Sequence, residues 1–145
     1  MTLDGLRPDE RIAPARDLRA HLEHWSGATG IAVEVWALPR EPLALPLAEL
    51  VQATVLDILA GFEADGTVRH VGFALTAGAR GLRLTVSGDG IGLPPGRLAE
   101  RLQVAQARFA AWDGRLSVNA VLGGGITVSA TLKPGGTERR PRRHR

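Results

Sequence analysis

Apolar residues recur at helical spacing in three stretches of the chain. The first predicted helix begins at Ala13 and ends in a turn at residues 26–30, the second opens at Pro46, and the third covers residues 96–112. Pro46 suits a first helical turn because that position needs no backbone N–H donor. The apolar positions mark one face of each helix: Leu18, Leu22 and Trp25; Leu47, Leu50, Val51, Thr54, Val55, Ile58, Leu59 and Phe62; Leu98, Leu102, Ala105, Phe109 and Trp112. The other face of the second helix is expected to carry Glu49, Gln52, Asp57 and Gly61.

Between and after these helices, apolar and polar residues alternate as they do in half-buried strands. Residues 31–38 predict one strand, 68–75 and 82–86 predict an antiparallel pair, and 116–120 and 126–132 predict the last two. The sequence shows no internal repeat. The order of elements predicts an α+β fold, a two-layer sandwich in which a mixed, mostly antiparallel sheet carries its helices on one face.

A glycine-rich stretch, VSGDGIGLPP from Val86 to Pro95, separates the second predicted hairpin strand from the third helix. Glycine occupies positions 88, 90 and 92, where the absence of Cβ allows positive φ angles and a close approach to a ligand or to another loop. Between a strand and a helix, such a loop is typical of a nucleotide cradle, and it is equally compatible with a tight surface turn.

Composition changes this picture only at the C-terminal end. The 145 residues, 44% hydrophobic and 23% charged, fit one globular domain with a sizeable core. The formal net charge of +3 divides unevenly: 12 arginines against 14 acids up to Leu132 give −2, and six basic residues against Glu138 alone give +5 from Lys133 on. We therefore expect one folded domain over residues 1–132 and a disordered basic tail over residues 133–145.

What the sequence lacks argues against several classes of protein. It has no cysteine, which excludes disulfides and thiolate metal sites and is compatible with a reducing cytoplasm. His21 and His24 have no third ligand nearby in the sequence, so no metal site is expected there. Because no apolar run approaches the ~20 residues of a membrane span and the N-terminus lacks the apolar segment of a signal peptide, we expect a cytoplasmic protein without a membrane segment.

Three features taken together resemble a known family. They are the stretch WSGATGIAVEV at residues 25–35, the glycine loop after the hairpin, and the glycine turn before the last strand. In this order they resemble the ATP-binding domain of sensor histidine kinases, of the GHKL type or Bergerat fold, and are most similar to the nitrate-sensor-like class of two-component kinases. The resemblance covers residues 3–132.

The resemblance implies a catalytic helix, in which the family carries a glutamate followed four residues later by an asparagine that holds Mg²⁺. Asp57 and Gly61 match these positions. The resemblance therefore implies a base or metal ligand at Asp57, whereas Gly61 has no side chain and offers no oxygen to a metal. The basic residue that follows in the family falls near Asp65, an acid.

The resemblance also implies a nucleotide site in the glycine loop. The family's Asp-x-Gly-x-Gly, whose aspartate reads adenine, corresponds to Gly88-Asp89-Gly90-Ile91-Gly92, so the carboxylate lies one residue late and is expected to point to the other side of the backbone. The lid glycines of the family are replaced within residues 101–104, and only the turn at residues 123–127 still matches the last glycine box. The nucleotide-binding residues implied by the resemblance are Gly88, Asp89, Gly90, Gly92, Gly123, Gly125 and Thr127.

Three hypotheses for function follow. The first is a degenerate histidine-kinase-like domain with weak or lost ATP and Mg²⁺ binding that docks to a sensor kinase or response regulator; Trp36, out of phase with the apolar side of its strand, would mark a partner surface if exposed. The second is an ATP–Mg²⁺-binding catalytic domain that transfers phosphoryl groups from ATP to histidine. The third is a binder of acidic partners or nucleic acid through Arg139, Arg140, Arg142, Arg143 and Arg145, although the tail lacks the aromatic residues that stack on bases.

Overall fold

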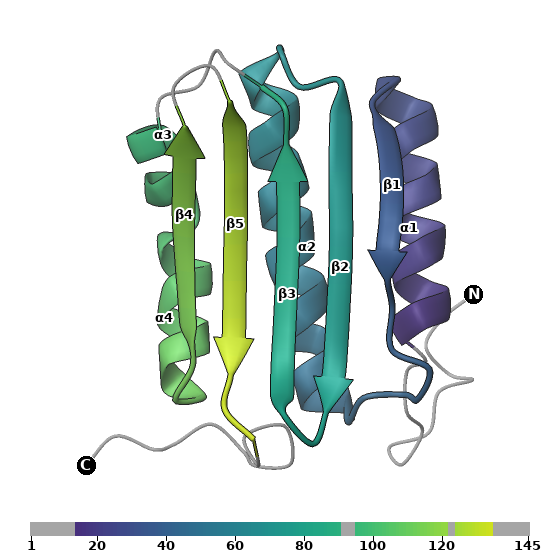
Figure 1. Cartoon of the computed structure of the whole chain (residues 1–145), viewed down its shortest axis with the longest axis vertical. Helices are drawn as coiled ribbons and strands as arrows, with labels where there is room; N and C mark the ends of the chain where they lie inside the picture. The colour runs from purple at the N-terminus through teal and green to yellow at the C-terminus, as the bar shows by residue number, and fades with distance from the viewer. Residues whose placement is uncertain (1–13, 91–94, 122–123, 135–145) are drawn as a thin grey trace, which may run out of the picture.

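The computed structural model describes residues 14–90, 95–121 and 124–134 and shows a sheet covered on one side by helices (Figure 1). The sheet has the strand order β1-β2-β3-β5-β4, in which β1 runs parallel to β2 and all other neighbours are antiparallel. The predicted α+β fold with a mixed, mostly antiparallel sheet is therefore confirmed. The elements in chain order are α1 (Pro14–Thr29), β1 (Ala32–Ala37), α2 (Leu45–Asp65), β2 (His70–Gly78), β3 (Gly81–Gly88), α3 (Pro95–Arg101), α4 (Gln103–Ala111), β4 (Arg115–Val121) and β5 (Gly125–Leu132).

The core lies between the sheet and the helices. Alternation along β3 and β5 turns every second residue toward the helices, among them Leu84, Val86 and Val128, which are fully buried. All eight residues of the stripe predicted for α2 are buried against this face. The C-terminal end of α2 is terminated by Gly66, whose φ of 82° is the left-handed conformation typical of a helix C-cap.

Gly61 is the exception to the predicted division of α2 into two faces. It was expected on the polar side, but it is buried. The reason is α3, which crosses α2 at this point: a Cβ added to Gly61 would lie 2.5 Å from Leu98 Cδ1 and 3.2 Å from Arg101 Cδ. The helices approach this closely because residue 61 has no side chain.

The third predicted helix is divided into α3 and α4. Leu102 lies between them with φ −96° and ψ 12°, and its N–H is shared between the carbonyl groups of Leu98 and Ala99. The shared hydrogen bond tightens the turn and changes the direction of the chain. Through this change, four residues are all fully buried: Leu98 of α3, Leu102 between the two helices, and Ala105 and Phe109 of α4.

The hairpin of β2 and β3 is longer than predicted. Gly78 pairs with Gly81, so only two residues form the turn, and pairing continues to Val71 and Gly88 at the other end. Gly81 has a φ of 99°, which a side chain rarely adopts. The first glycine of the predicted loop, Gly88, is consequently the last residue of a strand.

The predicted disorder of the basic tail concerns residues beyond Pro134, which lie outside the described residues, and it stays a prediction.

The expectation that no apolar run is long enough to span a membrane does not hold for α2. By length and composition alone, this helix could cross a membrane, with a mean hydropathy of 1.5 over its best window. However, 56% of that window is buried in the fold, as in a core helix.

Candidate functional site

The predicted site begins at the end of β3, where Gly88 faces the helices. A Cβ at Gly88 would lie 3.2 Å from Cε2 and Cζ of Phe62, an α2 side chain that is 1% exposed. Any longer side chain at position 88 would have to displace this ring. The space beneath the glycine loop is therefore occupied by the protein's own aromatic side chain.

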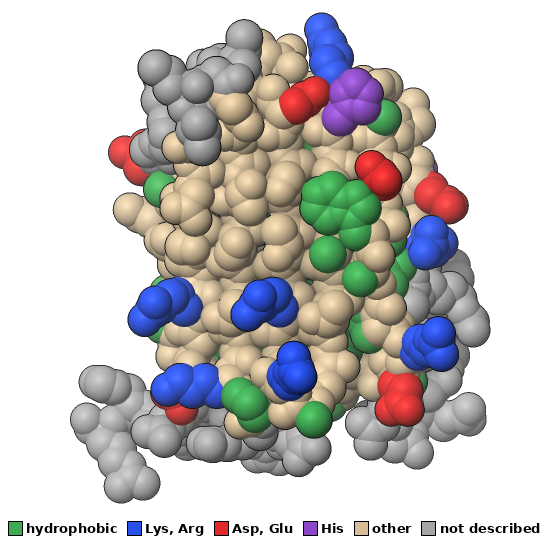
Figure 2. Space-filling model, viewed as in Figure 1, with side chains coloured by type: hydrophobic (Ala, Val, Ile, Leu, Met, Phe, Trp, Pro, Cys, Tyr) green, Lys and Arg blue, Asp and Glu red, His purple; other side chains and the backbone are tan. Residues whose placement is uncertain are grey.

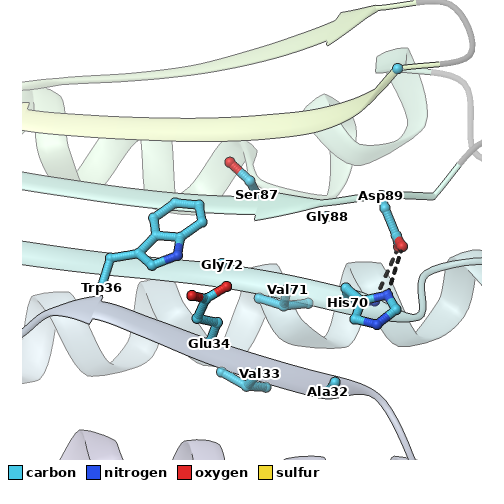
Figure 3. A pocket seen from close by; sticks show the side chains of 11 residues that line it. Ala32, Val33, Glu34, Trp36, His70, Val71, Gly72, Ser87, Gly88 and Asp89 are labelled. Atoms are coloured by element: carbon cyan, nitrogen blue, oxygen red, sulfur yellow. Dashed lines mark hydrogen bonds and ion pairs between the residues drawn. The ribbon is translucent and has the colours of Figure 1, made fainter.

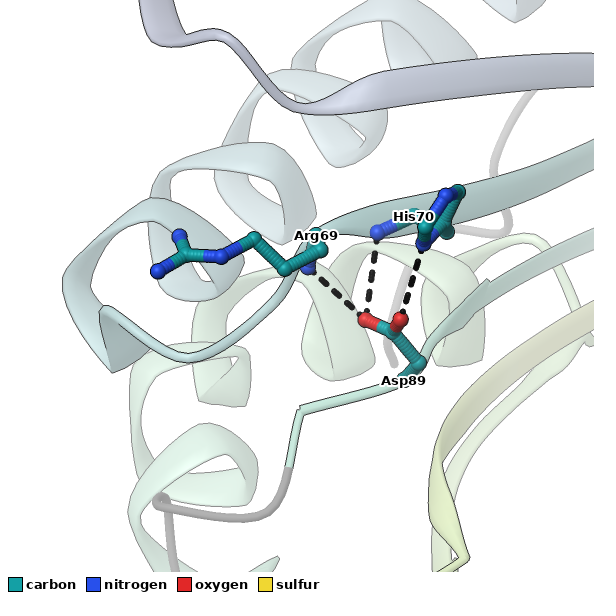
Figure 4. A network of polar contacts seen from close by, with 3 residues as sticks. All are labelled: Arg69, His70 and Asp89. Carbon is teal, nitrogen blue, oxygen red and sulfur yellow. Dashed lines mark hydrogen bonds and ion pairs between the residues drawn. The ribbon is translucent and has the colours of Figure 1, made fainter.

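Asp89 points away from that space and binds the start of β2 (Figure 4). Its Oδ1 accepts hydrogen bonds from the backbone N–H groups of Arg69 (2.8 Å) and His70 (3.1 Å), and its Oδ2 lies 3.1 Å from Nδ1 of His70. Partial burial raises the pKa of Asp89, but these three hydrogen bonds together with the charge of His70 outweigh it, and the pKa is lowered overall. Through these hydrogen bonds, the carboxylate links the end of β3 to the first residues of β2.

Gly90 lies against the turn that follows α2. A Cβ there would meet Cγ2 of Val68 at 2.5 Å, and Oδ2 of Asp65 and Oγ1 of Thr67 at 3.0 Å. The other oxygen of Asp65, Oδ1, accepts hydrogen bonds from the N–H (2.7 Å) and the hydroxyl group of Thr67. Asp65 Oδ2 is buried and has no hydrogen-bond partner among the described residues. An acidic residue thus lies where the family resemblance would place a basic one.

Two of the three predicted positions in the last glycine box are described, and they face different surroundings. Gly125 has a φ of 93°, and a Cβ there would lie 2.5 Å from the carbonyl oxygen of Gly88. Thr127 alternates with the buried Ile126 and Val128 and therefore faces the side of the sheet without helices, where its hydroxyl lies 3.1 Å from that of Ser87. Gly92 and Gly123 lie outside the described residues.

The structure thus brings together only part of the predicted site. Gly88, Asp89, Gly90 and Gly125 meet at one end of the sheet, whereas Thr127 faces the opposite side from α2. Asp57 lies half-buried on α2, one helical turn before Gly61. The roles suggested for these residues in catalysis and nucleotide binding stay predictions.

A shallow cavity of about 400 Å³ lies where α3 meets α2. It is lined by Gly61, Ala64, Arg97, Glu100 and Arg101. The two arginines supply positive charge on this side, and Glu100 partly offsets it. Sequence analysis did not find this cavity, because it depends on the crossing of two helices rather than on a motif.

A second cavity lies on the open face of the sheet, away from the helices (Figure 3). It measures about 350 Å³, and its walls include Glu34, Trp36, His70, Ser87 and Asp89. Trp36 is 55% exposed, and its ring lies over Gly72, where an added Cβ would be 2.1 Å from Cη2 of the ring. The exposed position considered for Trp36 is confirmed, and the glycine beneath it explains how the ring lies flat on β2.

A third cavity, of about 410 Å³, lies between α1 and β1. Leu22, Val33 and Val35 form its apolar part, with Arg19, Glu23 and Ser26 beside them. Within the described residues, no group of three or more histidine, cysteine, aspartate or glutamate side chains is placed to hold a metal ion.

Comparison with known proteins finds solved structures of similar fold. The sequence itself matches no protein-family model and no curated protein. Among solved structures, it is similar to the histidine kinase domain of the Erythrobacter litoralis EL346 blue-light activated histidine kinase, with a TM-score of 0.71, 16% identity, and coverage of 92% of this chain and 67% of that one.

Two further solved structures give the same result. The Acinetobacter baumannii histidine kinase AdeS has a TM-score of 0.63, 10% identity, and coverage of 84% of this chain and 64% of that chain. A longer structure of the Erythrobacter litoralis EL346 blue-light activated histidine kinase has a TM-score of 0.66, 18% identity, and coverage of 86% and 46%. The chain spans only part of each of these proteins, and at such identities the likeness establishes a histidine-kinase-like fold alone.

Proposed function

We propose that this chain is a GHKL-type, histidine-kinase-like domain with weak or lost ATP binding, which acts by docking to a sensor kinase or response regulator of a two-component system. The fold it shares with histidine kinase domains supports the kinase-like part of this proposal. The closer similarity to the nitrate-sensor-like class belongs to the same proposal and rests on residues 25–35. The filled positions around the glycine loop support the loss of nucleotide binding.

The contact between Gly61 and α3 carries the proposal. Residue 61 corresponds to the Mg²⁺-holding asparagine of the family that the sequence resembles. Even a Cβ atom added to Gly61 would lie 2.5 Å from Leu98 Cδ1. Neither the glycine nor the leucine offers an oxygen ligand, which Mg²⁺ requires. The residues present do not fit a metal at this position, and no catalytic step is derived through one.

The position that would read adenine is altered in the same way. Gly88 provides no carboxylate, and a Cβ atom added to Gly88 would lie 3.2 Å from the ring of Phe62. Losing a buried hydrogen bond to the base costs about 1–3 kcal/mol, or up to about a hundredfold in affinity. Losing the metal as well removes the charge that stabilises a transferring phosphoryl group. The two changes together favour a docking domain over a phosphotransfer enzyme.

The thermal midpoint of unfolding with and without about 5 mM ATP–Mg²⁺ tests the proposal. A ligand that binds only the folded state at about 100 times its Kd would add about 2.7 kcal/mol to the free energy of unfolding and raise the midpoint by several degrees. We expect a change of less than about 1 °C with ATP–Mg²⁺ and with ADP. A midpoint that rises with nucleotide concentration would instead support the ATP-binding catalytic domain.

A further inference from the structure

Among the residues that the structure describes, the outer edge of β1 has no neighbouring strand. β1 is the first strand of the sheet, and among the described residues no strand lies beyond it (Figure 1). The N–H of Ala32 donates to the carbonyl of Arg69 (2.9 Å), so Ala32 and Glu34 direct their backbone groups toward β2. Because these directions alternate along a strand, Val33 and Val35 direct their N–H and C=O groups to the open edge. Such an edge is a template for another strand.

Each face of this edge has its own cavity. On the helix side, the cavity of about 410 Å³ between α1 and β1 is lined by Leu22, Val33 and Val35. On the open side, the cavity of about 350 Å³ contains Glu34 and Trp36. A strand placed beside β1 would send alternate side chains to these two faces.

The open-face cavity favours positive charge. Trp36 lies on β2 with one ring face over Gly72 and remains 55% exposed, which leaves aromatic surface free for a cation. Glu34 is exposed on the same face, two residues before Trp36, and belongs to none of the ion pairs of the described residues. The carboxylate of Asp89 adds negative charge at the far end of the cavity.

Figure 2 shows this face of the molecule as a whole. Neutral polar and backbone surface covers much of the sheet, hydrophobic side chains gather toward the β1 side, and lysine and arginine side chains gather toward the lower end. Exposed arginines on the open face belong to β3 and β4, at Arg83 and Arg115, away from Trp36. In the same view acidic side chains also lie at other edges of the molecule, but the exposed Glu34 and Trp36 belong to β1, two strands away from Arg83 on β3 and four strands away from Arg115 on β4.

We propose that the open edge of β1 takes up an extended strand from a partner protein, with apolar and basic residues in alternation. The apolar side chains would enter the cavity between α1 and β1, and a lysine or arginine would lie over Trp36 beside Glu34. The backbone of the added strand would pair with Val33 and Val35. This inference rests on the docking role proposed above and names the surface and the chemistry of the partner.

Two peptides of defined composition test the proposal on the full chain. One is a capped heptapeptide of alternating valine and arginine, and the other is the same peptide with glutamate in place of arginine. Binding is followed by NMR on the isotope-labelled chain. The arginine peptide is expected to bind more tightly, to shift the amide signals of Val33 and Val35, and to slow hydrogen exchange at those two amides. Strand pairing predicts this slowing, and loose charge attraction does not.

Three variants separate pairing from general charge. Val33→Pro removes an edge-facing N–H and leaves the β1–β2 hydrogen bonds in place, so we expect a loss in affinity of about tenfold. Glu34→Lys is expected to reverse the preference between the two peptides. Glu49→Lys makes the same charge change on the exposed side of α2, away from β1, and serves as the matched control, with affinity unchanged within about twofold. The thermal midpoint of each variant checks that it folds.

Several outcomes would overturn the proposal. Equal weakening by Glu49→Lys and Glu34→Lys would reduce the effect to net charge. Unshifted Val33 and Val35 amides in the presence of saturating peptide would place binding elsewhere. A wild-type chain that sediments as a dimer and becomes monomeric as Val33→Pro would assign the edge to a second copy. The nucleotide titration is independent of these results, so loss of peptide binding leaves the conclusion on ATP untouched, and the reverse also holds.

Discussion

At the scale of single residues, Asp89 shows how a shift of one position changes the role of a carboxylate. One residue earlier, the carboxylate would face Phe62 and the helices. At position 89 it faces the start of β2, where it accepts hydrogen bonds from two backbone N–H groups. These hydrogen bonds stabilise the ionised form and account for its lowered pKa. The same residue that the resemblance assigns to a nucleotide therefore has a structural reason to be present.

Asp89→Asn is expected to lower the stability of the fold at neutral pH. The amide can still accept a backbone hydrogen bond, but it loses the charge, and because the side chain is 47% exposed we expect only about 1 kcal/mol. The folded-state pKa lies below the ordinary value of 3.8, so the wild-type advantage is present above that value and is lost as the pH falls through the folded-state pKa.

Thermal midpoints of the wild type and Asp89→Asn between pH 7 and pH 2.5 measure this effect. The difference between the two proteins is expected to be largest above about pH 4, where Asp89 is ionised, and to shrink steadily as the pH falls further. A difference that stays constant across this range would show that the ionised carboxylate is not what stabilises the wild type.

At the scale of elements, the crossing of α2 and α3 depends on Gly61. Gly61→Ala adds a Cβ 2.5 Å from Leu98 Cδ1, which is fully buried, so we expect a loss of about 1–3 kcal/mol in the free energy of unfolding. Gly27→Ala in α1 is the matched control, because nothing lies within 4 Å of its added Cβ. There the higher helix propensity of alanine is expected to stabilise the protein by up to about 1 kcal/mol.

Chemical denaturation of the two alanine variants distinguishes overpacking from propensity. Gly61→Ala should lose stability while Gly27→Ala holds or gains it. If both variants gained stability to the same extent, α3 would be free to move away from α2, and the filled space that argues against a metal at position 61 would open readily.

The sequence pattern was sufficient for the order of elements and insufficient for their crossings. Alternation of apolar residues predicted the strands, and helical spacing of apolar residues predicted the α2 stripe, because burial follows local periodicity. The glycine spacing drew attention to the end of β3. The break at Leu102 and the burial of Gly61 depend on contacts between helices far apart in the chain. The hydrogen-bond partners of Asp89 are Arg69 and His70, which lie 20 and 19 residues away in the chain, and no local pattern identifies them.

At the scale of the whole molecule, one hydrophobic core joins every helix and strand. The buried cluster contains residues from α1 (Leu18), α2 (Ile58), the sheet (Leu84) and α4 (Phe109). Trp25 of α1 donates a further hydrogen bond to Glu63 of α2 (3.3 Å). A domain of this size with a single core is expected to unfold in one cooperative step.

Leu84→Ala tests this cooperativity from the middle of the sheet. Leu84 is fully buried on β3, between Leu75 of β2 and Ala130 of β5, so its truncation is expected to cost about 2–5 kcal/mol. The tryptophans report on separate elements, with Trp25 in α1, Trp36 on β1 and Trp112 at the end of α4. In versions that retain one tryptophan each, with phenylalanine at the other two positions, all three fluorescence midpoints should fall together with the far-UV circular dichroism midpoint. If Trp25 alone kept its midpoint or melted first, α1 would be a separate unit, and the cavity it forms with β1 would open independently of the sheet.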